Sequence, residues 1–123
     1  MQALVIDDSR AVRMIIGNIL REAGMDVFEA GDGQQGIDQL ENNPDIELIL
    51  VDWNMPVMNG YEFIQAVRAQ HIYDGIRIMM VTTEAESEQV TKALAAGANE
   101  YLMKPFTKEV LIAKLSMLDV LEY

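Results

Sequence analysis

The chain has 123 residues, with 20 acidic against 9 basic side chains and a net charge of −11. This length predicts a single domain, and the charge repels phosphate backbones and anionic lipid, so we expect no direct binding of nucleic acid. Cysteine is absent, which excludes thiolate zinc and disulfide chemistry. No apolar run approaches the ~18 residues of a membrane span and no signal peptide opens the chain, so we expect a cytoplasmic protein.

Short apolar runs alternate along the chain with longer segments of helical spacing. The first run covers residues 3–6, and the apolar residues after it fall on one face of a helix that Gly24 can end, namely Val12, Ile15, Ile16, Ile19 and Leu20. The succession recurs four times, with strand runs at 27–28, 48–51, 78–81 and 101–103. The sequence therefore predicts five β-α units.

Three of these strands are apolar on both faces instead of alternating. Strands of this kind lie in parallel sheets that helices cover on both sides. Right-handed crossovers between such strands produce a doubly wound α/β fold of three layers. No linker or low-complexity segment divides the chain, so we predict one domain over residues 1–123.

Polar residues stand where four of the five strands end. They are Asp7 and Asp8 after the first strand, Asp52 after the third, Thr82 and Thr83 after the fourth, and Lys104 after the fifth. In open α/β sheets, ligands bind outside the carboxyl ends of the strands, near the switch in strand order. We therefore expect these side chains to converge on one site.

The three carboxylates of this expected site repel one another. At about 4–5 Å and an effective dielectric constant near 20, each pair costs about 3–4 kcal/mol. Capping of the first helix by Asp7 or Asp8 is the simpler interpretation of either residue alone, but capping does not offset that repulsion. Hard oxygen ligands with open positions favour Mg²⁺, or Mn²⁺, and we predict a divalent metal site.

Asp52 ends the most apolar strand, and its carboxylate is either a third metal ligand or a nucleophile toward a phosphoryl group. Lys104 favours the second interpretation, because an ammonium group can neutralise phosphoryl charge, although a surface lysine is the simpler alternative. The Thr82 hydroxyl could donate to a phosphoryl oxygen, but a threonine at a strand end is common without such a role.

Four segments together resemble the receiver domain of bacterial two-component response regulators. They are Val5-Ile6-Asp7-Asp8, Asp52-Trp53-Asn54-Met55-Pro56, Val81-Thr82-Thr83-Glu84 and Tyr101-Leu102-Met103-Lys104-Pro105-Phe106. The match covers essentially the whole chain in order and spacing. Trp53, Asn54, Glu84 and Tyr101 make the chain most similar to the single-domain chemotaxis regulators of the CheY type.

The resemblance implies a flavodoxin-like (βα)5 fold with a parallel sheet of strand order 2-1-3-4-5. It implies that Asp52 is the phosphoacceptor, which takes its phosphoryl group from a phosphohistidine of a histidine kinase. Asp8 and Asp52 match direct Mg²⁺ ligands, the main-chain carbonyl of Asn54 matches a third, and Asp7 matches a position that acts through water. A regulator of this family is a phosphoacceptor and not an enzyme with a separate substrate.

The family also implies roles for residues around the acceptor. Lys104 matches the lysine that pairs with the phosphorylated site, Thr82 the switch hydroxyl, and Tyr101 the ring that turns inward. Asn54 and Glu84 match positions that influence the rate of dephosphorylation. The output face would contain Tyr101 and Lys114, and its target would be a downstream protein such as a flagellar motor switch protein; a phosphatase is a further expected partner, and the protein is expected to be a monomer.

Departures from the family and rival classes leave alternatives open. Ser9 stands where chemotaxis regulators often have Phe, Val57 and Asn59 replace the usual loop residues, and the fourth helix carries only Lys92, which weakens the link to the flagellar motor. A phosphorelay intermediate or a receiver cut from a larger regulator would have the same site. A phosphatase of the haloacid dehalogenase type needs an Asp where Asn54 stands. In a flavodoxin-like FMN-binding protein, the paired aspartates would repel the phosphate of FMN.

Overall fold

The computed structural model describes residues 1–83 and 87–121. Within these residues, five strands alternate with five helices in chain order, and one 3-10 turn, His71–Tyr73, precedes the fourth strand. The strands are β1 (Gln2–Ile6), β2 (Asp26–Ala30), β3 (Ile46–Asp52), β4 (Arg77–Thr83) and β5 (Glu100–Lys104). The helices are α1 (Arg10–Glu22), α2 (Gly33–Asn42), α3 (Gly60–Arg68), α4 (Ser87–Ala96) and α5 (Lys108–Met117). The predicted succession of β-α units is confirmed.

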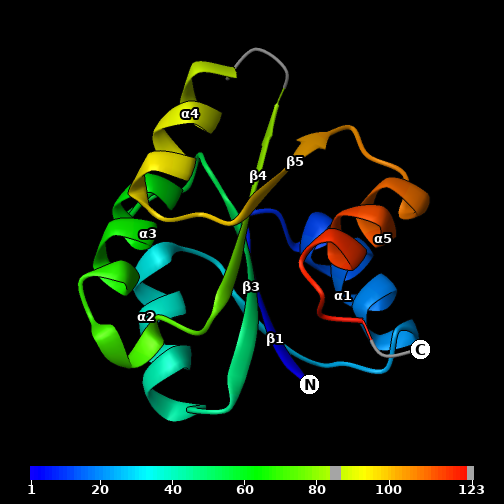
Figure 1. Cartoon of the computed structure of the whole chain (residues 1–123), viewed down its shortest axis with the longest axis horizontal. Coiled ribbons are helices and arrows are strands. Elements are labelled where there is room, and N and C mark those ends of the chain that lie inside the picture. Colours follow the sequence, from blue (N-terminus) through cyan, green and yellow to red (C-terminus); the bar gives the residue numbers. More distant parts are fainter. Residues whose placement is uncertain (84–86, 122–123) are drawn as a thin grey trace.

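The strands form one parallel sheet of order β2-β1-β3-β4-β5. The order reverses between β1 and β3, because the chain first adds β2 on one side of β1 and then crosses to the other side. Helices α2, α3 and α4 cover one face of the sheet, and α1 and α5 cover the other (Figure 1). This is the doubly wound, flavodoxin-like three-layer fold that the sequence predicts.

Two hydrophobic cores fill the spaces between the sheet and its helices. Successive strand residues point to opposite faces, so neighbours such as Leu50 and Val51 belong to different cores although both are fully buried. The core beneath α2, α3 and α4 includes Leu4, Ile6, Ile49, Val51, Phe63, Ile64, Ile78 and Met80. The core beneath α1 and α5 includes Ala3, Val5, Ile16, Leu20, Leu48, Leu50, Met79, Val81, Leu111 and Leu115.

Local signals in the sequence set several helix ends. Ser9, Asp32, Asn59 and Thr107 are N-caps whose side chains accept a backbone N–H of the first turn. Gly24 and Gly97 follow α1 and α4 with φ of 91° and 120°, a conformation that favours glycine. Among the described helices, none is long and apolar enough to span a membrane.

Candidate functional site at the carboxyl ends of the strands

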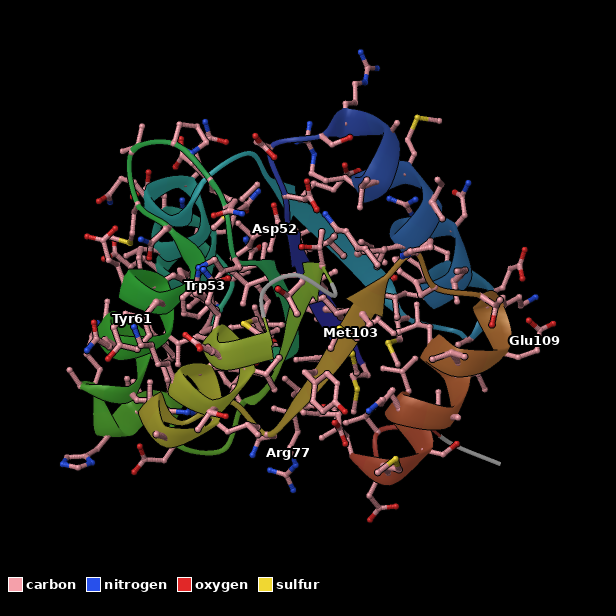
Figure 2. All side chains as sticks on the ribbon, turned by 90° about the horizontal axis from the view of Figure 1, so that it is seen from above. Asp52, Trp53, Tyr61, Arg77, Met103 and Glu109 are labelled. Atoms are coloured by element: carbon pink, nitrogen blue, oxygen red, sulfur yellow. The ribbon has the colours of Figure 1, made fainter. Side chains whose placement is uncertain are left out.

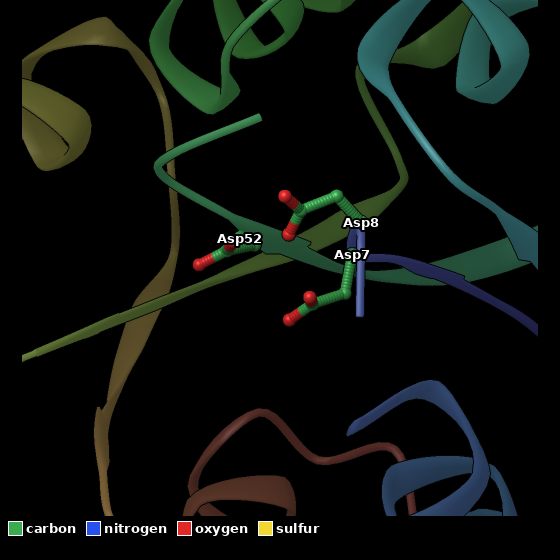
Figure 3. Close-up of side chains that lie close together, drawn as sticks. All are labelled: Asp7, Asp8 and Asp52. Atoms are coloured by element: carbon green, nitrogen blue, oxygen red, sulfur yellow. The ribbon is translucent and has the colours of Figure 1, made fainter. Parts of the chain in front are cut away.

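Three carboxylates from two separate parts of the chain meet at the carboxyl end of the sheet. Asp7 and Asp8 follow β1, and Asp52 ends the neighbouring strand β3. One carboxylate oxygen from each lies within 4.8 Å of the others (Figure 3). Asp7 and Asp52 are buried, whereas Asp8 is exposed. The predicted convergence of these three residues is confirmed.

The N-terminus of α1 is capped by Ser9, not by either aspartate. The Ser9 hydroxyl accepts the Val12 N–H at 3.3 Å, and the Asp7 carboxylate accepts the Ser9 N–H at 2.8 Å. Asp7 therefore orders the residue that caps the helix. Helix capping does not account for the aspartate pair, because the cap position is filled by its neighbour.

Lys104 completes the cluster from β5. Its Nζ lies 3.0 Å from Asp7 Oδ2 and 3.3 Å from Asp52 Oδ1, so one ammonium group bridges two buried carboxylates. The strand register pairs Lys104 with Thr83 on β4, and the Lys104–Pro105 peptide is cis. Asp7, Asp52 and Lys104 share one side of the sheet because each comes two residues after a member of the core beneath α1 and α5, namely Val5, Leu50 and Leu102.

The surroundings of Asp52 oppose its ionisation. Burial is the largest cause and repulsion by Asp7 the second, and together with Asp8 they raise the pKa of Asp52 to about 6 against the opposing effect of Lys104. Burial acts to lower the pKa of Lys104, but the hydrogen bonds and charges of Asp7 and Asp52 outweigh it, and that pKa is raised. Lys104 is thus a cation held among carboxylates.

The donor set fits a hard divalent cation. Three carboxylates around a single ammonium leave two negative charges in excess, and oxygen ligands of this kind suit Mg²⁺ or Mn²⁺. Asp8 is exposed and gives such an ion access from solvent. Asn54, the other predicted ligand, is exposed and lies two residues after the end of β3. The three carboxylates of the predicted Mg²⁺ set therefore lie together at the carboxyl end of the sheet.

Thr82 and Tyr101 belong to the other side of the sheet. Thr82 is fully buried near the end of β4 and comes two residues after Met80, which is part of the core beneath α2, α3 and α4. Tyr101 packs against the same core and pairs with Met80 across the strands. Glu84, predicted to influence dephosphorylation, lies outside the described residues.

Tyr101 lies in a second polar cluster, with two charged neighbours. Lys114 Nζ is 4.0 Å from the centre of the Tyr101 ring and 3.1 Å from Glu100 Oε1. The same carboxylate oxygen accepts the Tyr101 N–H at 2.9 Å. The structure thus brings Tyr101 and Lys114, both expected on the output face, into contact, and adds Glu100, which the sequence interpretation did not include.

Sequence reasoning missed two features next to Asp52. A Cβ on Gly60 would lie 2.4 Å from the Asp52 carbonyl oxygen, so α3 begins in direct contact with the end of β3 only because this residue is glycine. Trp53 is buried and lies beside Tyr61, with ring centres 5.6 Å apart (Figure 2). The Asn59-Gly60 pair predicts a turn, but its contact with Asp52 depends on how α3 packs.

A separate cavity lies at the opposite end of the sheet. It has a volume of about 520 Å³, and its lining includes residues at the amino-terminal ends of three strands, namely Met1, Ile46 and Arg77. The acidic cluster lies at the carboxyl ends of two of these strands, β1 and β3. The cavity is therefore distinct from the site described above.

Comparison with known proteins agrees with this fold. The family described as the response regulator receiver domain matches residues 3–116, which is nearly the whole chain. An open parallel sheet of this order with an acidic cluster at its carboxyl edge is the arrangement of that class. The chain belongs to the response regulator receiver domain family.

Individual relatives point to a narrower group within the family. The chain is 48% identical over 122 residues to a chemotaxis protein CheY homolog of Campylobacter jejuni, which covers 98% of this chain and 92% of that protein. It is 44% identical to chemotaxis protein CheY1 of Helicobacter pylori, with 95% of each chain covered. The crystal structure of chemotaxis protein CheY4 of Vibrio cholerae superimposes with a TM-score of 0.86 at 37% identity over 98% of both chains. The chain is therefore similar to CheY chemotaxis proteins over nearly its full length.

Proposed function

We propose that this protein is a phosphoacceptor of a two-component system, in which Asp52 takes a phosphoryl group from a phosphohistidine on a histidine kinase. The observation that carries the proposal is the Lys104 bridge between Asp52 and Asp7 within a cluster of three carboxylates. A buried carboxylate beside a cation and further oxygen ligands has what a phosphoryl group needs on arrival. The cysteine-free composition is compatible with this exchange in the cytoplasm.

Asp8, Asp52 and the carbonyl of Asn54 would hold Mg²⁺, with Asp7 acting through water. When bound, the ion supplies positive charge for the oxygens of the phosphoryl group. Lys104 supplies a further positive charge that is already in place, because its ammonium group forms ion pairs with two carboxylates before any phosphoryl group arrives. Three carboxylates, one divalent cation and one ammonium sum to zero charge.

In the transfer itself, a carboxylate oxygen of Asp52 forms a bond to phosphorus as the bond from phosphorus to the imidazole nitrogen of the kinase breaks. The nitrogen keeps the electron pair of that bond, and the product is an acyl phosphate. The attacking oxygen must be ionised, and Lys104 favours the ionised form of Asp52 against burial and the neighbouring aspartates. Asn54 and Glu84 would set the rate at which water removes the phosphoryl group.

Signalling would follow from charge imbalance. The acyl phosphate carries about −1.5 to −2 charges in place of the single negative charge of the ionised Asp52 carboxylate, and this extra charge recruits Lys104 and the hydroxyl of Thr82. Movement of Thr82, which lies on the same side of the sheet as Tyr101, would let the tyrosine ring turn inward. The output face would therefore include Tyr101 and Lys114, on β5 and α5.

The similarity to CheY chemotaxis proteins supports chemotaxis as the process. We further propose a flagellar motor switch protein as the downstream target, a phosphatase as a further partner and a monomer as the acting form. A phosphorelay intermediate, or a receiver of a larger regulator, would use the same chemistry with another target. These alternatives differ in partner and not in the site.

The decisive experiment is incubation with acetyl phosphate and Mg²⁺, followed by intact mass measurement. We expect a gain of one phosphoryl group that is lost in Asp52→Asn and retained in Asp45→Asn, a control at an exposed aspartate. Uptake by Asp52→Asn, or no uptake by the wild type, would contradict the proposal. Sustained hydrolysis of a phosphomonoester would instead favour a phosphatase of the haloacid dehalogenase type.

A further inference from the structure

Arg13, on the first turn of α1, reaches back to the strand end that carries the acidic cluster. Its Nη1 donates to the carbonyl oxygen of Asp7 at 2.5 Å, and its Nε lies 3.1 Å from Glu29 Oε1 on β2. The Arg13 side chain is 18% exposed, so it lies mostly within the protein. One guanidinium therefore connects α1, β2 and the peptide that joins Asp7 to Asp8.

The other polar groups of Asp7 are already held. Its N–H donates to the Ala30 carbonyl at 3.1 Å, and its two carboxylate oxygens contact the Ser9 N–H and Lys104. The carbonyl that Arg13 binds belongs to the peptide leading to Asp8. The orientation of that peptide sets the direction in which the Asp8 side chain projects from the backbone. This matters because the Asp8 side chain is exposed and not fixed by packing.

Glu29 orients the guanidinium group of Arg13. The planar guanidinium can use Nε and Nη1 in two directions at once, toward Glu29 and toward the Asp7 carbonyl. A lysine ammonium has no such fork. Arg21, two turns further along α1, also pairs with Glu29, with its Nη2 at 3.7 Å from Oε2. Because Arg21 contacts the same carboxylate as Arg13, it serves as the control cation for Arg13.

We propose that Arg13, aimed by Glu29, is a positioning residue that fixes the Asp7–Asp8 peptide so that the Asp8 carboxylate faces Asp52 in the geometry a divalent cation requires. The inference rests on the proposed function, since it concerns the same metal site. Residues that orient metal ligands commonly change metal affinity by about 10–100-fold when they are replaced.

Electrostatics and positioning predict opposite effects of removing Arg13. If Arg13 acted only as a nearby positive charge, Arg13→Gln would make the site more negative and tighten Mg²⁺ binding. If Arg13 positions Asp8, the same change weakens binding although the site becomes more negative. The sign of the change therefore separates the two roles.

The experiment is a Mg²⁺ titration at constant ionic strength, followed by the fluorescence of Trp53, the single tryptophan, which adjoins Asp52. We expect Arg13→Gln and Arg13→Lys each to raise the Kd for Mg²⁺ about 10-fold or more. Glu29→Gln should raise it as well, and the Arg13→Gln/Glu29→Gln double variant should bind no more weakly than Arg13→Gln alone. Arg21→Gln should bind Mg²⁺ as the wild type does.

Circular dichroism and urea unfolding in EDTA show whether each variant is folded, and if Arg13→Gln does not fold, Arg13→Lys and Glu29→Gln carry the test. Unchanged or tighter Mg²⁺ binding by folded Arg13→Gln, full affinity in Arg13→Lys, or unchanged affinity in Glu29→Gln overturns the positioning role. In those cases the wild type still binds Mg²⁺ and the proposed function stands. Absence of Mg²⁺ saturation in the wild type overturns both.

Discussion

The ionised form of Asp52 is stabilised by one charged neighbour and destabilised by two others. Lys104 favours its ionised form, whereas burial and the charges of Asp7 and Asp8 favour the protonated form and raise the pKa of Asp52 to about 6. An unfolded chain exposes Asp52 to water, where its pKa returns to the usual value of 3.8. Between pH 3.8 and about pH 6, Asp52 therefore binds a proton in the folded protein that it does not bind in the unfolded chain.

The pH dependence of stability follows from that difference. The stabilising contribution of protonated Asp52 is fully present below pH 3.8 and is lost as the pH rises through about 6. Without metal, Asp52→Asn should therefore raise the free energy of unfolding at pH 8 by about 2–3 kcal/mol, with a smaller gain at pH 5. Urea unfolding in EDTA, followed by circular dichroism, measures both differences.

Asp45→Asn provides the control for this prediction, because Asp45 is exposed and lies outside the acidic cluster. It should not reproduce the larger gain at pH 8 than at pH 5 that is expected of Asp52→Asn. If Asp52→Asn gave an equal gain at pH 5 and pH 8, or destabilised the protein at pH 8, ionised Asp52 would not be under the repulsion inferred here.

At the scale of elements, the loop between β3 and α3 contains a strained turn. The Met58 N–H donates to the Pro56 carbonyl at 2.7 Å, and Val57 between them has a φ of 66°. A β-branched residue rarely adopts positive φ, and three-residue turns of this form are strained. Val57 is 82% exposed, so packing contributes little to its placement.

Replacing Val57 with glycine should stabilise the protein. Relief of about 1–3 kcal/mol of backbone strain exceeds the roughly 0.5–1 kcal/mol that glycine loses in backbone entropy, so we expect a net gain of about 1 kcal/mol. Ile72→Gly is the matched control, since Ile72 is 83% exposed and β-branched but lies in a right-handed 3-10 turn. It should lower the midpoint of urea unfolding; a gain there, or a loss in Val57→Gly, would contradict the strain.

At the scale of the whole molecule, charge is the dominant feature. The net charge of −11 disfavours compaction, and any salt relieves part of that repulsion. A metal bound at the acidic cluster would add a specific effect, because a ligand that binds the folded state alone stabilises it by RT ln(1 + [L]/Kd). Screening of the net charge should occur with any salt, whereas stabilisation by binding at the acidic cluster requires a divalent cation.

Mg²⁺ should therefore raise the melting temperature more than NaCl at equal ionic strength. At ten times its Kd, Mg²⁺ adds about 1.4 kcal/mol to the free energy of unfolding. Asp8→Asn should lose this excess, because it removes a ligand that is exposed and outside the Lys104 bridge. Thermal unfolding by circular dichroism provides the measurement, and equal shifts with Mg²⁺ and NaCl in the wild type would count against the metal site.

The sequence predicts the main architecture of this protein because its signals are local. Apolar runs such as 48–51 and the residues that follow them define strands and their ends, and a parallel sheet brings all such ends to one edge. Asp52 and Lys104 can therefore be assigned to one site although 52 positions separate them. Gly24 and Gly97 mark helix ends for a similarly local reason.

Other features could not be predicted from the sequence, since they depend on the rotation of helices and the register of strands. Arg13 and Glu29 meet across 16 positions, and nothing in the sequence around either residue predicts the contact. Glu100 joins Lys114 for the same kind of reason, through the packing of α5 on β5. Which strand ends carry charge can be read from the amino-acid sequence, because an apolar run and the residues that follow it are local features of the chain. Which side chains then align those charges was settled by long-range packing, which places residues from separate elements in contact.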